Sequence, residues 1–378
     1  MKFKAKCGDI KPAVLLAANV ADKNGPMPIL HNVLIDSAKD GVILRACDQT
    51  QRVTVAAPAA VLELGTTTVP ADTLRDIVKL YPDDAEVSFS SDGGRVKIKV
   101  GSDEFKIMAL PADEYPQHQA PGHTTRFTVK AFSLLQTLGA VLYAVPAKDH
   151  RKVLTGVCLA LNGNTLTAIG TDGKKLAKSC LNLPEVEGVS KATIIVPPAI
   201  VENVVRSVDP NEQVSVSFSD RDITFSFGSV SLTSTLIEGK YPDVDAVIPK
   251  EFAHRIVMNR EAFIKALRRA GVAADEKSKS VVLIFEDNKC SFHSERQDLG
   301  AFSGSVAVEY GGPGIGTAFS FALLMETLDA IDIPGILMLI KNPTAPVVFK
   351  KGNDATDLHL LMPIKVTDAS QTVSREAE

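Results

Sequence analysis

An internal repeat constrains the fold of this chain more than any other feature of the sequence. Three segments each join a short strand pattern to an apolar helix pattern: MKFKAKCGDIKPAVLLAANVA, TRFTVKAFSLLQTLGAVLYAV and HRIVMNREAFIKALRRAGVAA. Phe3, Phe127 and Ile256 occupy equivalent positions in these segments. Because self-similarity at a regular spacing is the signature of a duplicated structural unit, the chain is predicted to contain three copies of one domain.

A second strand-to-helix step supports the same division. It reads TTVPADTLRDIVKLYPDDAEVSFS in the first copy, TIIVPPAIVENVVRSVDPNEQVSVSFS in the second and TAFSFALLMETLDAIDIPGILMLI in the third. Polar stretches that contain proline separate the copies, as is typical of domain boundaries. We therefore predict domains at 1–120, 125–247 and 252–366. The polar segment 367–378 has no hydrophobic periodicity and is predicted to be disordered.

The strand patterns indicate an α+β fold. Period-two alternation in EVSFSSDGGRVKIKV, around Asp92, Gly93 and Gly94, predicts an antiparallel hairpin with one buried face. Each domain is therefore expected to form an antiparallel sheet with both of its helices packed on one side.

A further hairpin is predicted in IGTDGKKLAK, residues 169–178. Asp172-Gly173 is a dipeptide favoured in two-residue turns, in which both central positions have positive φ. The pattern predicts the turn, but it does not by itself decide whether Lys174, Lys175 and Leu176 also belong to a functional site.

The sequence indicates no enzymatic chemistry. It contains no G-x-x-x-x-G-K-[ST], H-E-x-x-H or G-x-S-x-G motif, and GGPGIG at 311–316 is predicted to be a plain loop. The seven histidines and five cysteines are scattered without metal-ligand spacing, so we expect reduced thiols, no metal and no cofactor. No signal-peptide pattern and no apolar run long enough to span a membrane are present, and a cytoplasmic location is expected.

Positive charge is concentrated in the helix patterns, although the formal net charge of the chain is -4. In the helix expected at 259–274, Arg260, Lys265, Arg268 and Arg269 accompany one acid, Glu261. Any one such residue is adequately explained as part of a solvated helix face. Cations on the helix side of three repeated domains, however, predict a positive stripe that binds nucleic-acid phosphates.

Such binding is expected to be independent of base sequence, because no aromatic or base-reading side chains interleave with the cations. The cations assigned to this stripe are Lys23, Arg75, Lys79, Lys148, Arg151, Lys152, Arg206, Lys265, Arg268 and Arg269.

Several segments in a fixed order resemble the bacterial sliding clamp family, the β subunit of replicative DNA polymerase III. They are PILHNVLI at 28–35, TTVPADTL, TDGKKLA, GKYPDVDAVIP and the closing LMPIKV, and the resemblance covers 1–366. It implies three clamp domains in each protomer and a homodimer closed head to tail into a ring, with sheets outside and helices lining a hole for double-stranded DNA. It also implies a processivity factor without catalytic activity that slides on DNA.

The resemblance further implies an apolar pocket between domains 2 and 3, which binds short linear peptides of the replicative polymerase, the clamp loader and repair proteins. Its residues here, called the peptide site below, would be Leu154, Thr171, Gly173, Lys174, Lys175, Leu176, Pro242, Val247, Leu323, Leu360, Met362, Pro363 and Ile364. The chain departs from the family pattern at Lys174-Lys175, where His-Arg is frequent, at Ala246, where Arg is common, and at Ser278, where an aromatic is common.

Two further sets of residues follow from the resemblance. Asn24 takes the place of a DNA-contacting Arg beside Lys23, and Asp72 and Pro198 stand where basic residues are usual. For the ring interface, we expect Phe105 and Ile107 on an edge strand to meet Val272 and Ala273 at a helix end.

Two other classes of function remain as alternatives. The rival interpretation is a three-domain adaptor that binds proteins without encircling DNA. A hydrolase is disfavoured because no nucleophile, base and orienting group occur together.

Overall fold

The computed structural model describes residues 1–117, 122–274, 280–296, 300–352 and 357–364. Ser278 and the predicted disordered segment 367–378 lie outside these residues. Contacts divide the chain into two compact units. The first comprises Met1–Leu135, Asn162–Asn164 and Leu183–Ile237, and the second comprises Gln136–Leu161, Thr165–Asn182 and Glu238–Glu378.

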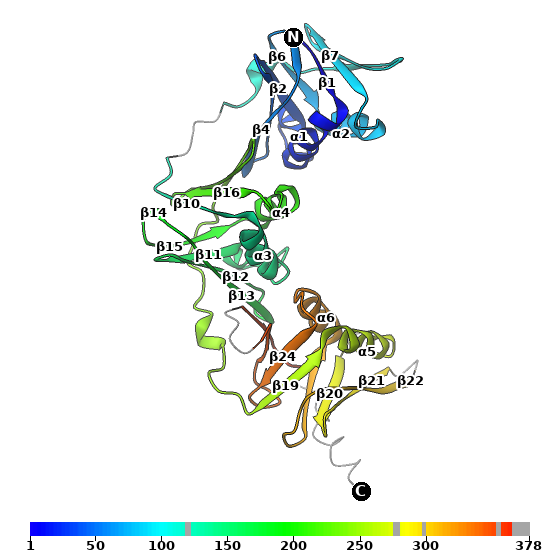
Figure 1. The fold of residues 1–378 in the computed structure, drawn as a ribbon, viewed down its shortest axis with the longest axis vertical. Helices are drawn as coiled ribbons and strands as arrows, with labels where there is room; N and C mark the ends of the chain where they lie inside the picture. Colours follow the sequence, from blue (N-terminus) through cyan, green and yellow to red (C-terminus); the bar gives the residue numbers. More distant parts are fainter. Residues whose placement is uncertain (118–121, 275–279, 297–299, 353–356, 365–378) are drawn as a thin grey trace. The chain divides into compact units, whose positions relative to one another are not determined.

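The first repeat forms strands and helices in the predicted order. Its elements are β1 (Lys2–Lys6), α1 (Cys7–Val20), η1 (Pro28–His31), β2 (Asn32–Ala38), β3 (Gly41–Cys47), β4 (Gln51–Ala57), β5 (Ala60–Glu63), β6 (Thr66–Pro70), α2 (Ala71–Leu80), β7 (Glu86–Asp92), β8 (Arg95–Val100), β9 (Asp103–Met108) and η2 (Ala112–Glu114). Figure 1 shows α1 and α2 side by side against these strands. The β7–β8 hairpin turns at Gly93 and Gly94, which have φ of 48° and 110°, as the sequence predicts.

The second repeat follows the same plan. Its elements are β10 (Thr125–Lys130), α3 (Ala131–Leu142), η3 (Lys152–Thr155), β11 (Val157–Asn162), β12 (Thr165–Thr171), β13 (Lys175–Asn182), β14 (Glu187–Gly188), β15 (Lys191–Val196), α4 (Pro198–Ser207), β16 (Gln213–Phe218), β17 (Asp222–Phe227) and β18 (Val230–Thr235), followed by η4 (Asp245–Val247).

The third repeat completes the series. Its elements are β19 (His254–Asn259), α5 (Arg260–Val272), β20 (Ser280–Glu286), β21 (Lys289–Arg296), β22 (Gly300–Ala307), β23 (Ile315–Ser320), α6 (Phe321–Asp329), β24 (Gly335–Ile340), β25 (Val347–Lys350) and β26 (Leu358–Leu361). The glycine-rich segment 311–316 leads into β23 and not into a helix N-terminus, in agreement with the plain loop expected there.

The sheets differ from the expectation of one sheet for each domain. In the first unit, the strands lie in the orders β5-β1-β7-β8-β9 and β14-β10-β16-β17-β18-β4-β3-β2-β6, so β4 of the first repeat pairs with β18 of the second. In the second unit, the orders are β11-β12-β13-β26-β25-β24-β19 and β22-β21-β20-β23, and β13 of the second repeat pairs with β26 of the third. The expectation fails because pairing across the repeat boundary satisfies strand edges that would otherwise be exposed.

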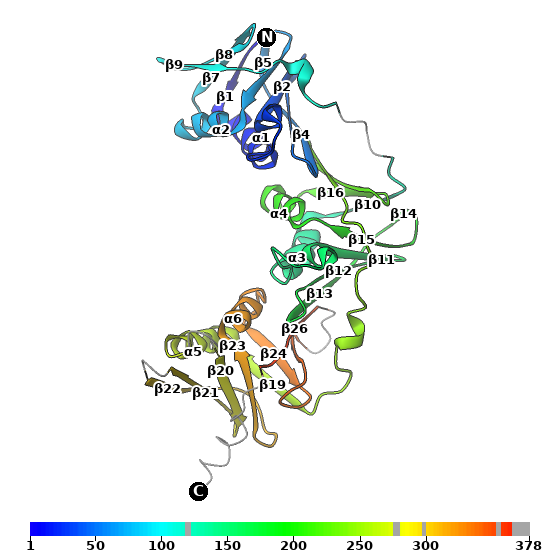
Figure 2. The ribbon, with the colours of Figure 1, turned by 180° about the vertical axis from the view of Figure 1, so that it is seen from behind.

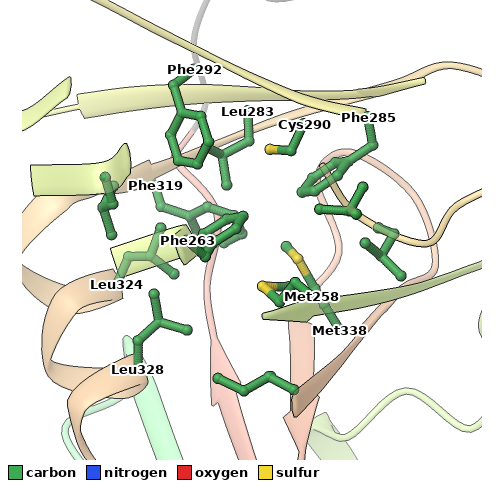
Figure 3. Close-up of a cluster of buried hydrophobic side chains, with 14 of the residues drawn as sticks. Met258, Phe263, Leu283, Phe285, Cys290, Phe292, Phe319, Leu324, Leu328 and Met338 are labelled. Carbon is green, nitrogen blue, oxygen red and sulfur yellow. The ribbon is translucent and has the colours of Figure 1, made fainter. Parts of the chain in front are cut away.

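Each unit is held by apolar side chains between its helices and sheets. In the second unit, Phe263 of α5 lies among Phe292, Phe319 and Leu324, and Figure 3 shows these side chains converging from helix and strands. The rings of Phe263 and Phe292 are 5.0 Å apart between centroids. Burying a side chain of this size contributes about 1.5–3 kcal/mol, so this cluster fixes the positions of α5 and α6 against the strands.

Candidate functional site

The β12–β13 hairpin is the starting point of the site. Thr171 and Leu176 are paired across it, and the amide of Asp172 donates to the carbonyl of Lys175 over 3.3 Å. The Asp172 carboxylate in turn accepts from the amides of Lys174 and Lys175 over 2.7 and 2.8 Å. Only Gly173 in this turn has positive φ, at 86°, so the expected two-residue turn with two positive φ values is wrong. The side-chain bonds of Asp172 stabilise a longer turn instead.

Strand β26 adds to the hairpin in the second unit. Leu176 is directly opposite Leu360, and both side chains are at most 3% exposed. The ladder continues past β26, because the amide of Met362 donates to the carbonyl of Lys174 over 2.8 Å. Ile364 donates to Ala318 of β23 over 2.7 Å, which anchors the segment that includes Pro363. Residues far apart in the sequence are thus held beside one another by backbone hydrogen bonds.

Lys175 and Leu176 lie on opposite faces of β13, because successive strand residues alternate. The Lys175 side chain is only 9% exposed and forms an ion pair with Glu326 of α6. Its ammonium group also lies 5.4 Å from the ring centroid of Tyr143. Lys174, in the turn, is exposed. The two adjacent lysines therefore have different surroundings, and Lys174 is the one whose charge is available to solvent.

A buried polar pair lies on the same face as Lys175. Nδ1 of His359 hydrogen-bonds with the hydroxyl of Tyr143 over 3.0 Å, and His359 is only 1% exposed. Burial lowers the pKa of His359 to about 4, with a smaller contribution from Lys351, and burial raises the pKa of Tyr143. His359 is therefore neutral near pH 7. It holds β26 against the segment that follows α3.

The other face of β13 is approached by the segment 238–248. Lys178 forms an ion pair of 2.6 Å with Asp245 of η4. Val247, at the end of η4, is 52% exposed, and Pro242 is also exposed. Met362 is 39% exposed. These residues leave apolar surface of the second unit in contact with solvent.

The remaining members of the peptide site lie in α6 and η3. Leu323 of α6 is partly buried and lies one helical turn before Thr327, whose hydroxyl donates to its carbonyl. Leu154 of η3 is 2% exposed, and its amide donates to the carbonyl of Arg151. All thirteen predicted residues belong to the second unit.

The sequence predicts Arg151 to be one of the DNA-facing cations, and in the structure its side chain contacts the hairpin of the peptide site. Its guanidinium pairs with Asp149 and donates over 3.2 Å to the carbonyl of Asp172. A Cβ added to Gly173 would lie 3.4 Å from the same guanidinium. Arg151 therefore supports the turn, a relationship that the sequence spacing does not reveal.

The other predicted DNA-facing residues differ in how their charges are paired. Arg75 pairs with Asp72 and Asp76, Lys23 with Asp72, Arg206 with Glu202, and Lys265 with Glu261. The other members of the set, Asn24, Lys79, Lys148, Lys152, Arg268 and Arg269, are exposed, and no ion pair is present at their side chains within the described part of the chain.

Helix α5 explains why its cations are exposed. Asn259 caps the helix, accepting from the amide of Ala262 over 2.9 Å. Phe263, Leu267 and Ala270 are buried on one side, which leaves Arg268 and Arg269 on the other. No helix within the described residues has the length and apolar character needed to cross a bilayer.

The residues expected at the ring interface lie on accessible elements of separate units. β9 is the last strand of its sheet, with Phe105 and Ile107 partly buried and Met108 67% exposed (Figure 2). The Phe105 ring packs edge-on against Tyr81 at 6.4 Å. At the end of α5, Val272 is 73% exposed, and Ala273 is partly exposed.

Family models identify the three repeats. Residues 1–119 match the N-terminal domain of the DNA polymerase III beta subunit, 128–243 match its central domain, and 245–365 match its C-terminal domain. The chain belongs to the DNA polymerase III beta subunit family. It is a DNA sliding clamp, a processivity factor without catalytic activity, and the adaptor interpretation is not favoured.

Curated relatives of the beta subunit extend over nearly the whole chain. The beta sliding clamp of Caulobacter vibrioides strain NA1000 is 29% identical and is matched over 94% of this chain and 99% of its own length. The beta sliding clamp of Synechococcus elongatus is 26% identical over 97% of this chain and all of its own length.

Solved beta-subunit structures have the same fold. A sliding clamp from Pseudomonas aeruginosa bound to griselimycin has a TM-score of 0.92 at 22% identity, covering 97% of this chain and all of that chain. One from Bartonella birtlesii, also bound to griselimycin, has a TM-score of 0.90 at 26% identity with the same coverage. The fold therefore consists of three tandem clamp domains.

Proposed function

We propose that the peptide site of this sliding clamp binds short linear peptides of the replicative polymerase, the clamp loader and repair proteins. The observation that carries the proposal is the buried pairing of Leu176 with Leu360, with Met362 exposed two residues after Leu360 and Val247 exposed in η4, which the Lys178–Asp245 ion pair joins to β13. Apolar anchors of a peptide would cover Val247 and Met362, and the exposed ammonium of Lys174 would contact a polar or acidic group of the same peptide.

Lys175 is proposed to act differently from the other members of the site. Its side chain lies on the opposite face of β13 from Leu176 and is paired with Glu326. It would support the position of β13 against α6 without contacting a peptide. The similar clamps that hold griselimycin are consistent with a ligand-binding surface in this family.

For DNA, we propose that the predicted DNA-facing cations, which lie in α2, α4 and α5 or follow α1 and α3, contact the phosphates of an enclosed duplex. Enclosure would retain the DNA, so individual contacts can be weak, and the clamp would slide because no base edge is read.

The ring itself would be a homodimer in the cytoplasm, and each protomer would contribute the domains 1–120, 125–247 and 252–366. It would close where Phe105 and Ile107 of one protomer meet Val272 and Ala273 of the other. A twofold axis generates two identical contacts of this kind and thereby closes the ring.

Peptide binding is tested with a fluorescent peptide from the clamp-binding segment of the replicative polymerase, by anisotropy. Val247→Ala and Met362→Ala should each weaken binding about tenfold, or about 1.4 kcal/mol. Val257→Ala is the matched control, because Val257 of the second unit is 39% exposed, the same fraction as Met362, and lies outside the predicted site. Unchanged binding by both site variants, or equal weakening by the control, would overturn the assignment.

A further inference from the structure

A cavity of about 710 Å³ lies in the first unit, apart from every residue assigned to DNA, peptide or dimer contact. Strands β3, β4 and β18 contribute one side, and the segment around η2 contributes another. Arg52, Val53 and Thr54 all border it, but the side chains of Val53 and Val55 alternate with those of Arg52 and Thr54 and are buried, and α1 packs against β4. The cavity is therefore on the face of the sheet opposite to α1.

The register of the strands brings five polar side chains into one group. Arg52 is opposite Thr233, and Thr54 is opposite both Ser231 and Arg45. All five line the cavity. Directly opposite side chains in an antiparallel pair have Cβ atoms about 4.5–5.5 Å apart, so two guanidinium groups and three hydroxyls lie within reach of one small ligand.

The two arginines differ in their partners. Arg45 forms an ion pair with Asp36, whose other oxygen accepts from the hydroxyl of Thr66 over 2.7 Å. The side chain of Arg52, by contrast, has no hydrogen bond or ion pair with any other described residue, although Arg52 is partly buried. The other carboxylate that lines the cavity, Asp113, is exposed on η2, where water and salt screen its charge.

His123, which lies near Arg52, belongs to a chain of hydrogen-bonded hydroxyl groups. His123 hydrogen-bonds with Ser217 and Thr224 over 2.9 and 3.2 Å, and Thr224 hydrogen-bonds with Thr233. Burial lowers the pKa of His123, with Asp222 opposing this and Arg126 and Arg52 adding to it. Arg52 thus lies beside a chain of hydroxyl groups, and its guanidinium has no ion-pair partner among the described residues.

An apolar wall faces this polar group. Tyr115 is 6% exposed and packs with Ile29, Leu30 and Leu34, and the thiol of Cys47 donates to its hydroxyl over 3.6 Å. These contacts hold the segment after η2 in place. The cavity therefore has a fixed apolar side and a cationic, hydroxyl-rich side, and its volume lies within the range of about 300–1,000 Å³ that is typical of small-molecule sites.

We propose that this cavity binds a small molecule through a phosphate group, with Arg52 as the principal contact. A guanidinium presents a planar pair of donors that matches two phosphate oxygens, and the hydroxyls of Thr54, Ser231 and Thr233 supply further donors. Arg45, fixed by Asp36, orients the edge of the site. The phosphate comes either from free inorganic phosphate or from a phosphate monoester whose organic part packs against Tyr115.

The test is calorimetric titration of the full chain with AMP, inorganic phosphate and uncharged adenosine. We expect AMP or phosphate to bind with one site per chain and adenosine not to bind. Tighter binding of AMP identifies a monoester as the ligand, and equal binding of the two identifies free phosphate. Arg52→Gln should weaken the binding at least tenfold, and Ser231→Ala should weaken it by a smaller factor.

Arg221→Gln is the matched control, because Arg221 is an exposed arginine of the same unit that does not line the cavity. It should titrate like the unchanged protein. The proposal is overturned if neither anion binds at millimolar concentration, if Arg52→Gln binds as tightly as the unchanged protein, if Arg221→Gln weakens binding as much, or if adenosine binds as tightly as AMP.

Discussion

Leu176 of β13 and Leu360 of β26 are directly opposite each other, although a whole repeat separates them in the sequence. Both are buried, and the exposed side chain of Met362 follows two residues after Leu360. A strand of the second repeat and the last strand of the third repeat thus form one continuous ladder in the second unit. The proposed peptide surface depends on this pairing, since Leu176 comes from β13 and Leu360 and Met362 come from β26 and the segment after it.

Truncation of Leu176 should destabilise the second unit. Leu176→Ala removes a side chain that is 2% exposed, and large-to-small substitutions at such positions cost about 2–5 kcal/mol. Leu176→Met, which conserves volume, should cost less than about 1.5 kcal/mol. Urea unfolding of the two variants measures the difference. Equal stability of Leu176→Ala and the unchanged protein would show that the β13–β26 contact is not well packed.

Acidification should expose the contribution of His359. Its folded-state pKa is lowered to about 4, so between that value and its unfolded pKa near 6.5 the unfolded chain binds more protons. The stability contributed by neutral His359 is therefore present above pH 6.5 and is lost as the pH falls toward 4. Between pH 7 and pH 5 the loss should be about 2 kcal/mol.

Urea unfolding of the unchanged protein and His359→Gln at the two pH values isolates this effect from that of the carboxylates. The variant should lose about 2 kcal/mol less than the unchanged protein over this interval. An identical pH dependence of the two proteins would mean that His359 titrates normally in the folded state.

The exposed arginines of α5 should affect the salt dependence of DNA binding. Replacing Arg268 and Arg269 together by Gln removes two phosphate contacts, so the slope of log K against log salt should fall in magnitude by about 2. The control is Lys97→Gln with Lys99→Gln, two lysines of β8 that are paired with Glu104. If the control changes the slope as much as the α5 variant, the phosphate contacts are not specific to the helices.

The edge strand β9 should determine the oligomeric state. Phe105→Ala removes the ring that packs on Tyr81 and that is expected to meet the end of α5, so dimers should dissociate to monomers. Size-exclusion chromatography at low concentration measures the shift. A Phe105→Ala protein that elutes as a dimer would require a different interface.

The sequence predicts the repeated elements well because their patterns are local. The expected helix at 259–274 is observed as Arg260–Val272, and the Gly93-Gly94 turn has both positive φ values. The dipeptide at Asp172 predicts the wrong turn geometry, since it does not reveal that the Asp172 carboxylate accepts hydrogen bonds from two backbone amides.

Strand pairing across the repeats could not be predicted from local patterns. The opposition of Leu176 and Leu360, and the bond between Tyr143 and His359, join segments that no periodicity connects. Alternation along β13 could have shown that Lys175 and Leu176 face opposite ways. Glu326, the partner of Lys175, could not have been identified, because the sequence does not specify how α6 packs against β13.

Retention on circular DNA tests the sliding-clamp account most directly. The protein is loaded onto a nicked circular plasmid at moderate salt by a clamp loader that recognises it, and bound protein is measured before and after the plasmid is cut to a linear form. Encirclement predicts stable retention on the circle and loss on linearisation, since a sliding ring leaves at a free end. Equal retention on circular and linear DNA would contradict encirclement and indicate ordinary electrostatic binding.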